Sequence, residues 1–293
     1  MSGIKRVKGW FYVAPAVVLL FFLTVYPFAY SVYLSFFDVK GWSLRNISFC
    51  GFSNYLKVLS DPLFRGSLRF TSMYTVSALL IEFLLGLIIA FLVNEITESK
   101  FARFTKLITI LILLPILLPG VATATMFSLM LNDVIGAIPN ALKATLGFRV
   151  SFLSKPLSAT VSLLAVDVWQ WTSFFFLLIY AGLRMLPRET IEAARIEGAG
   201  ETLILRKIIL PQLRFVIIVA LVLRGIWLFR SFDIPRLLTA GGPGIATRTV
   251  SLQIYEYSFK QGLLGVAAAA TVIVLVIVNV VVLAYFRFQE GRE

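Results

Sequence analysis

Long apolar stretches alternate with short polar segments along most of the chain. A helix needs about 20 mostly apolar residues to cross a bilayer. Six stretches meet this requirement: Trp10–Phe36, Thr71–Val93, Leu107–Leu131, Ala159–Leu183, Phe215–Phe232 and Leu264–Phe286. We therefore predict an all-α integral membrane protein with six transmembrane helices. No linker or repeat divides the sequence, so we expect a single transmembrane domain over residues 1–293, with a core at about 70–286.

The first apolar stretch, residues 10–36, follows the basic residues Lys5, Arg6 and Lys8, as the apolar part of a signal peptide does. It is longer than such a peptide, and Tyr26-Pro27 stands where small residues would mark a cleavage site. We predict a retained N-terminal transmembrane helix.

The distribution of Lys and Arg predicts the orientation. These residues are denser in the segments 1–10, 94–106, 184–214 and 287–293 than in the segments between the remaining spans. Because cytoplasmic loops carry an excess of Lys and Arg, both termini and the 184–214 segment are expected in the cytoplasm.

Composition agrees with a membrane protein: 59% of the 293 residues are hydrophobic and only 14% are charged. Soluble domains carry about 45–50% apolar and about 25% charged residues. Basic residues near anionic lipid headgroups account for the net charge of +12, so nucleic-acid binding is not expected. One cysteine and no histidine exclude an intramolecular disulfide, a histidine-based metal site and a histidine general base. No cofactor is expected.

One polar stretch, residues 187–211, lies between the fourth and fifth apolar segments. Its first half is rich in helix-forming residues and carries Glu189 and Glu192 early, where a helix dipole favours acids. Gly198 and Gly200 offer a turn. A second helical run is expected from 201 to 210, with Pro211 in the opening turn of the next span.

The fixed positions of this stretch resemble the EAA loop of permeases from importers of the ABC (ATP-binding cassette) class. We call residues 184–214 the EAA loop. The resemblance implies that a dimer of ATPase subunits docks on this loop, with Glu192 at the start of the loop helix and Gly198 at its turn. The matching residues are Glu192, Ala193, Ala194, Gly198, Ile208, Leu210 and Pro211.

Weaker motifs resemble the sugar-importer branch, specifically its maltose-type first permease subunit. They are Tyr26-Pro27, Gly51–Tyr55, Asp61-Pro62 and Gly241-Gly242-Pro243, so the resemblance covers about residues 11–286. From the residues themselves, the second and third motifs indicate a short helix at the outer interface, and the last indicates a folded external loop. The resemblance further implies a second, related permease subunit and an extracytoplasmic solute-binding protein.

Polar and aromatic residues share one face in two predicted spans. Asp167, Gln170, Trp171 and Phe174 have helical spacing in the fourth span, and Arg224 and Trp227 have it in the fifth. Two interpretations stay open. One is a cavity in which the Trp rings stack on a sugar and the polar groups bind its hydroxyls. The other is an Asp167–Arg224 ion pair between two helices, with the Trp residues as packing.

The maltose-type resemblance favours the cavity, because it places substrate-binding residues in the helices before and after the EAA loop. It implies substrate-binding roles for Asp167, Gln170, Trp171, Phe174, Arg224 and Trp227. These are not the side chains of a maltose site, and Arg224 favours an anionic alternative such as a glycerol phosphate. Glu82 is expected to face either a partner subunit or a water-filled gap.

The sequence contains no Gly-x-x-x-x-Gly-Lys-Ser/Thr phosphate loop, so ATP would be bound and hydrolysed by partner subunits. We therefore expect a non-enzymatic, channel-forming subunit of an importer for a sugar, polyol or sugar phosphate, located in the cytoplasmic membrane. The alternative is an ion-coupled secondary transporter, a class built from inverted repeats, of which none is evident. A membrane-embedded enzyme lacks a catalytic constellation in the spans.

Overall fold

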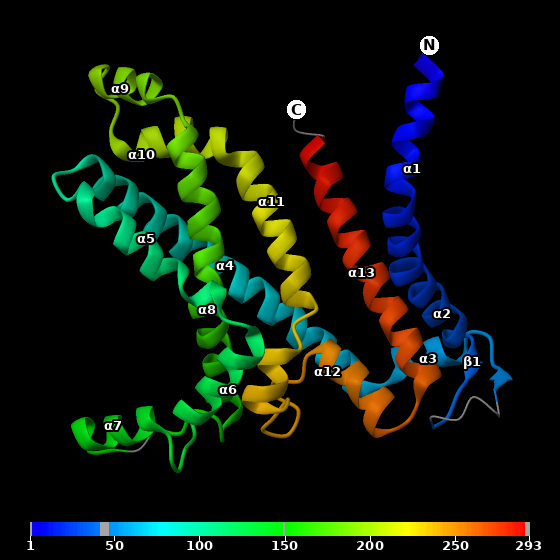
Figure 1. Cartoon of the computed structure of the whole chain (residues 1–293). Helices are drawn as coiled ribbons and strands as arrows, with labels where there is room; N and C mark the ends of the chain where they lie inside the picture. The colour runs from blue at the N-terminus through cyan, green and yellow to red at the C-terminus, as the bar shows by residue number, and fades with distance from the viewer. Residues whose placement is uncertain (1, 42–46, 149, 291–293) are drawn as a thin grey trace. The chain divides into compact units, whose positions relative to one another are not determined.

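The computed structural model describes residues 2–41, 47–148 and 150–290, and this part of the chain is mostly helical (Figure 1). It divides into two compact units. The terminal unit contains the chain up to residue 65 and from residue 253 on, and the central unit contains residues 66–252.

The terminal unit is built on two long apolar helical segments. The N-terminal segment comprises α1 (Ser2–Leu20), a π-helical turn (Phe21–Val25) and α2 (Tyr26–Ser35), which confirms a helix over the first predicted span. The C-terminal helix, α13 (Leu264–Glu290), packs against α2 and against the short α3 (Ser53–Ser60). The only strands in the described chain, β1 (Phe37–Asp38) and β2 (Ser48–Phe49), pair antiparallel after α2.

Asn54, in the second of the weak sequence motifs (Gly51–Tyr55), connects α3 to the end of α2. Its side-chain amide donates to the carbonyl oxygens of Ser35 at 3.0 Å and Phe37 at 2.9 Å. A Cβ atom at Gly265 would lie only 2.1 Å from the Phe37 carbonyl oxygen and 2.8 Å from the Asn54 amide nitrogen. The glycine therefore allows the start of α13 to approach this junction, and the short helix predicted here is confirmed.

Asp61, in the following Asp-Pro pair, holds two elements at once. Its carboxylate accepts a hydrogen bond from the Leu63 backbone N–H at 2.8 Å, at the start of α4 (Pro62–Glu98), and another from the Tyr257 hydroxyl. Burial and the hydrogen bond to Asp61 raise the pKa of Tyr257 above its ordinary value. The motif thus has a structural role in ordering the start of α4.

The central unit is arranged around α8 (Pro156–Met185), its most buried helix. Figure 1 shows α9 and α10 at one end of α8 and α7 at the other. The other α-helices are α5 (Thr105–Leu113), α6 (Gly120–Met130), α7 (Ala137–Leu146), α9 (Arg188–Ile196), α10 (Glu201–Ile204), α11 (Leu210–Phe229) and α12 (Val250–Tyr255), the last of which ends in the terminal unit. Short 3₁₀ turns cover Ala102–Phe104 and Pro115–Leu117, and π-helical turns cover Leu205–Ile209 and Pro235–Thr239. A further π-helical turn, Glu256–Lys260, belongs to the terminal unit.

Five helical segments of the described chain are long and apolar enough to cross a membrane. They are Tyr12–Ser35, Pro62–Glu98, Pro156–Met185, Glu201–Phe229 and Leu264–Tyr285. Each overlaps one of the predicted spans, but the fourth segment begins at Glu201, inside the predicted EAA loop, and not at Phe215.

The third predicted span is not continuous. It consists of Ala102–Leu117 and Gly120–Met130, which meet at an angle of 92°; we call this pair the broken span. The span predicted over 107–131 is therefore made of two helical pieces and not of one continuous helix. The break lies at Leu118-Pro119, because Pro119 disfavours helical geometry in Leu118, and neither Pro115 nor Pro119 has an N–H donor for the helix. Counted as one span, the pair makes six.

Helices α4 and α8 approach closely at Gly86. A Cβ atom there would lie 2.5 Å from the Phe175 Cβ and 2.9 Å from the Phe176 backbone nitrogen. Both phenylalanines are fully buried and belong to the main apolar core of the central unit. Gly86 lies one turn after Glu82, so the close approach also brings Glu82 near α8.

The Gly-Gly-Pro motif forms a folded loop without regular helix, as expected. Ala240 and Gly241 adopt left-handed backbone angles, with φ of 50° and 82°. The Thr247 backbone N–H donates to the Gly241 carbonyl at 3.1 Å, and its hydroxyl donates to the Gly242 carbonyl at 2.7 Å. These bonds close the loop on itself.

Candidate functional site

A buried charge cluster joins three helices of the central unit. Arg224 on α11 donates through Nε and Nη2 to the two carboxylate oxygens of Glu82 on α4, each at 2.8 Å. Its Nη2 also donates to an Asp167 carboxylate oxygen on α8 at 2.8 Å. The three residues are at most 2% exposed. The predicted Asp167–Arg224 ion pair is therefore present, with Glu82 as a third member.

Glu82 was expected to face a partner subunit or a water-filled gap, and the structure contradicts both alternatives. The side chain is fully buried against Arg224 of its own chain. The two residues are 142 positions apart, so local sequence gave no indication that they meet. One indication of the cluster was present in the sequence. Inside its predicted spans, away from their ends, lie two acids, Glu82 and Asp167, and one base, Arg224, and charged groups inside a membrane need partners.

The cluster compensates the Arg224 charge twice, because two carboxylates contact one guanidinium. A buried charge needs such pairing, since an isolated ion at membrane depth is costly. The argument that Arg224 attracts an anionic substrate loses its basis, because the guanidinium is already paired within the chain.

Three aromatic residues, which we call the aromatic patch, lie beside the cluster. The Trp171 ring centre is 4.4 Å from the Arg224 guanidinium carbon, a distance suited to a cation–π contact. Trp227 lies 5.3 Å from Trp171 and 5.4 Å from Phe174, measured between ring centres. Trp227 is 42% exposed, so the patch presents an accessible aromatic face next to a fixed charge.

Gln170 points to a different neighbour. Its Nε2 donates to the Leu118 carbonyl oxygen at 2.7 Å, at the bend of the broken span. The side chain is 2% exposed, and its Oε1 has no hydrogen-bond partner in the described part of the chain. Of the six residues predicted to bind substrate, the structure thus gathers five into the cluster and patch and gives Gln170 a backbone contact.

The EAA loop forms two short helices joined by a glycine turn. Gly198 has φ of 85°, its N–H donates to the Arg195 carbonyl, and the Ala199 N–H donates to the Ala194 carbonyl, both at 3.0 Å. These two bonds define a Schellman motif, which ends a helix with a left-handed residue. The predicted turn at Gly198 is confirmed, whereas Gly200 has an ordinary φ of −70°.

Glu192 lies in the middle of α9 rather than at its start, so that expectation is wrong. Glu189 occupies the first turn instead. Glu192 and Ala193 are exposed, whereas Ala194 and Ile208 pack against the apolar core. Gly198 and Pro211 are exposed as well, so Ala194 and Ile208 are the motif residues that anchor the loop to the core. Leu210 and Pro211 form the first turn of α11, as expected.

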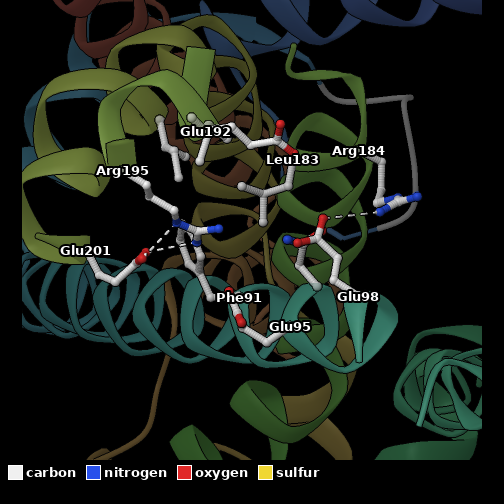
Figure 2. Close-up of a pocket in the computed structure, with 11 residues that line it drawn as sticks. Phe91, Glu95, Glu98, Leu183, Arg184, Glu192, Arg195 and Glu201 are labelled. Carbon is white, nitrogen blue, oxygen red and sulfur yellow. Dashed lines mark hydrogen bonds and ion pairs between the residues drawn. The ribbon is translucent and has the colours of Figure 1, made fainter. Parts of the chain in front are cut away.

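A small pocket is lined by residues of the EAA loop and of the ends of α4 and α8 (Figure 2). Arg195 points to Glu201 across it, with Nε at 2.9 Å and Nη2 at 3.2 Å, and Arg184 lies 3.9 Å from Glu98. The hydrogen bond to Glu201 and the negative charge of Glu201 raise the pKa of Arg195 above its ordinary value. The lining residues are Phe91, Asn94, Glu95, Glu98, Leu183, Arg184, Ile191, Glu192, Arg195, Glu201 and Ile209.

The pocket has a volume of about 80 Å³. Small-molecule sites usually measure about 300–1,000 Å³. It is therefore too small for a sugar, and its position indicates a structural joint between the EAA loop and the ends of α4 and α8.

Comparison with known families identifies the chain. The family described as "Binding-protein-dependent transport system inner membrane component" matches residues 82–292, which include the charge cluster, the aromatic patch and the whole EAA loop. The chain belongs to this family. This permease is thus a multi-pass membrane protein, and its mostly helical architecture with five or six apolar spans agrees with that assignment.

Two relatives of the permease have sugar-related names. It is 35% identical over 246 residues to the trehalose/maltose transport system permease protein MalF of Thermococcus litoralis, covering 84% of this chain and 81% of that one. It is 32% identical over 281 residues to the sulfoquinovosyl glycerol transport system permease protein SmoG of Agrobacterium fabrum, covering 96% and 89%.

The fold of the permease also matches a solved structure. A chain from a bacterial ABC transporter involved in the import of the acidic polysaccharide alginate superposes with a TM-score of 0.84, over 98% of this chain and 97% of that one. The sequence identity is 21%, so this likeness establishes the fold alone.

Proposed function

We propose that the permease is a channel-forming subunit of an ATP-driven ABC importer for a sugar or a related polyol or sugar phosphate. The observation that carries the proposal is the EAA loop: a short helix between two spans, ended by a Schellman turn at Gly198, with Glu192 and Ala193 exposed on it. The names of the sugar-importer relatives support the substrate class.

In this proposal the EAA loop faces the cytoplasm, together with both termini, and receives a dimer of ATPase subunits. The loop continues directly from α8 and into α11. Closure of the ATPases would move α9 as a rigid helix and tilt these two spans, which alternates access to the transport path. ATP is then bound and hydrolysed by the partners, and this chain is not itself an enzyme.

The substrate would bind at the charge cluster and aromatic patch. The exposed face of Trp227 and the neighbouring Trp171 and Phe174 suit the apolar face of a sugar ring. Asp167, Gln170 and Arg224 stay in the proposed set as hydrogen-bonding groups. A second, related permease subunit would complete the path in the cytoplasmic membrane, and an extracytoplasmic solute-binding protein would deliver the substrate to the opposite face.

The test is co-purification of the permease with its ATPase and its partner permease. Gly198→Asp is the test variant, because a side chain at φ of 85° strains the turn whatever space surrounds it. Gly200→Asp is the matched control: its φ is −70°, and no described atom lies within 4 Å of a Cβ placed there.

We expect wild type and Gly200→Asp to retain the ATPase and Gly198→Asp to lose it while remaining monodisperse in detergent. Loss in both variants would indicate that the added charge, and not the turn, is responsible. A wild-type chain that binds no ATPase and transports alone in liposomes would contradict the proposal and favour an ion-coupled secondary transporter.

A further inference from the structure

The bend of the broken span interrupts the helical hydrogen bonds of the backbone. Leu118 and Pro119 are extended, with ψ of 132° and 140°. Proline at 115 and 119 removes two N–H donors from the helical ladder. Carbonyl groups that lose their helical partners are costly at membrane depth, unless protein or water satisfies them. Hydrogen-bond donors on a neighbouring helix are therefore expected to stabilise such a bend.

Two side chains of α8 donate to backbone carbonyl groups of the broken span. The Ser173 hydroxyl donates to the Ile112 carbonyl oxygen at 2.6 Å, and the Gln170 Nε2 donates to the Leu118 carbonyl oxygen at 2.7 Å. Both side chains are 2% exposed. They are three positions apart and so adjacent along one side of the helix. One acceptor precedes the bend and the other lies within it, so together the two bonds hold the broken span on both sides of Pro115.

The same helix is bonded to the rest of the central unit. Asp167, one turn before Gln170, contacts Arg224 of α11, and the Tyr180 hydroxyl lies 3.0 Å from the Thr97 hydroxyl of α4. Gln170 is near the middle of the 30-residue α8. The bend is thus attached at mid-helix to the span that leads directly into the EAA loop.

We propose that Gln170 and Ser173 are positioning residues that fix the bend of the broken span and make that span follow α8 during transport. The proposal rests on the proposed function, in which the EAA loop tilts α8. In this proposal Gln170 holds the bend through its hydrogen bond to the Leu118 carbonyl oxygen, in addition to any contact with substrate. Without these two bonds, α8 slides past the broken span.

The test measures the distance between two spin labels, one on each arm of the broken span, in the full chain. The spread of this distance reports how firmly the bend is fixed. Cys50 is replaced by Ser, and labels are attached at Leu107→Cys and Leu129→Cys, which are 56% and 58% exposed and lie on the two arms of the broken span. The test variant combines Gln170→Met with Ser173→Ala. Because the Gln170 Oε1 has no partner in the described chain, Met removes only the bond to Leu118.

Thr172→Val is the matched control. Thr172 is a neighbouring buried residue of α8 whose hydroxyl has no hydrogen-bond partner among the described residues. We expect one narrow distance distribution in wild type and in Thr172→Val, and a broader one in the double variant. Ser173→Thr, which keeps a hydroxyl, should retain the narrow distribution. If the double variant does not fold, Ser173→Ala alone is measured and should broaden the distribution less.

A second label pair, at Leu177→Cys on α8 and Leu129→Cys on α6, tests the movement. In the importer assembled with its ATPase, this distance should be the same with and without ATP plus vanadate in wild type, and should differ between the two states in the double variant. Unchanged distributions in the double variant, or equal broadening by Thr172→Val, would overturn the proposal. Should the ATPase fail to assemble, the proposed function fails, but the first label pair still tests the bend.

Discussion

The charge cluster and the EAA loop use the same pair of side-chain types in opposite environments. In the cluster, Arg224 and its two carboxylates are at most 2% exposed. In the loop, the Arg195 and Glu201 side chains are 43% and 71% exposed. The shortest hydrogen bond of each ion pair is below 3 Å, yet desolvation makes the buried pair costly to break, whereas solvent screening makes the exposed pair contribute little to stability. Hydrogen-bond distances alone therefore do not show which ion pair contributes more to the stability of the fold.

The largest expected effect comes from Arg224→Leu. The substitution leaves the Glu82 and Asp167 carboxylates buried without a cation, which costs about 3–5 kcal/mol in comparable cases. We expect loss of most monodisperse protein in size-exclusion chromatography in detergent. Neutralising the acids as well, with Glu82→Gln and Asp167→Asn, should restore much of it. Arg230→Leu is the control, because this exposed arginine ends the same helix. Equal losses of monodisperse protein in Arg224→Leu and Arg230→Leu would contradict the claim that the buried ion pair contributes more to stability than an exposed charge.

Asp133 provides an intermediate case, since it is partly exposed. It follows α6 and accepts hydrogen bonds from the Ser151 hydroxyl at 2.7 Å, the Phe152 N–H at 2.8 Å and the Ser154 hydroxyl. Partial burial raises its pKa, but the hydrogen bonds from Ser154, Ser151 and Phe152 outweigh burial and lower the pKa below its ordinary value. Because the folded-state pKa is lowered, the contribution to stability is complete above the ordinary pKa of about 3.9 and is lost as the pH falls through the lowered value.

Asp133→Asn should therefore accelerate hydrogen exchange at the Phe152 amide at pH 7, with a local loss of about 1 kcal/mol. Below the lowered pKa, the variant and wild type should exchange at the same intrinsic-rate-corrected rate. A difference that persists unchanged at low pH would show that the carboxylate charge is not responsible.

The smallest effect is expected for Arg195 and Glu201. A double-mutant cycle with Arg195→Gln and Glu201→Gln should give a coupling energy of about 0.2–1 kcal/mol in thermal unfolding, decreasing with added salt. A salt-independent coupling as large as that of the charge cluster would remove the distinction between the two regions.

Sequence patterns predicted the features that depend on neighbouring residues. Five spans follow from runs of apolar residues, and the turn at Gly198 follows from the left-handed angle that glycine adopts without penalty. The bend at Leu118 was also signalled locally, by Pro115 and Pro119, but the apolar run across it favoured a continuous helix.

Contacts between distant segments could not be predicted in this way. Glu82 meets Arg224 across 142 positions, and Gln170 meets Leu118 across 52. Both contacts depend on how three or more helices pack, and that packing depends on close approaches such as the one at Gly86. Residue spacing placed Gln170 correctly on the polar face of its helix, but it did not distinguish a backbone carbonyl from a substrate as its partner.

The most direct measurement is uptake by proteoliposomes, with maltose, trehalose, lactose and sn-glycerol 3-phosphate as probes. The permease is reconstituted with or without its ATPase, its partner permease and its solute-binding protein. We predict uptake of at least one probe only when all components and internal ATP are present. Uptake by the permease alone, driven by an ion gradient and independent of ATP, would contradict its assignment as an ABC importer subunit.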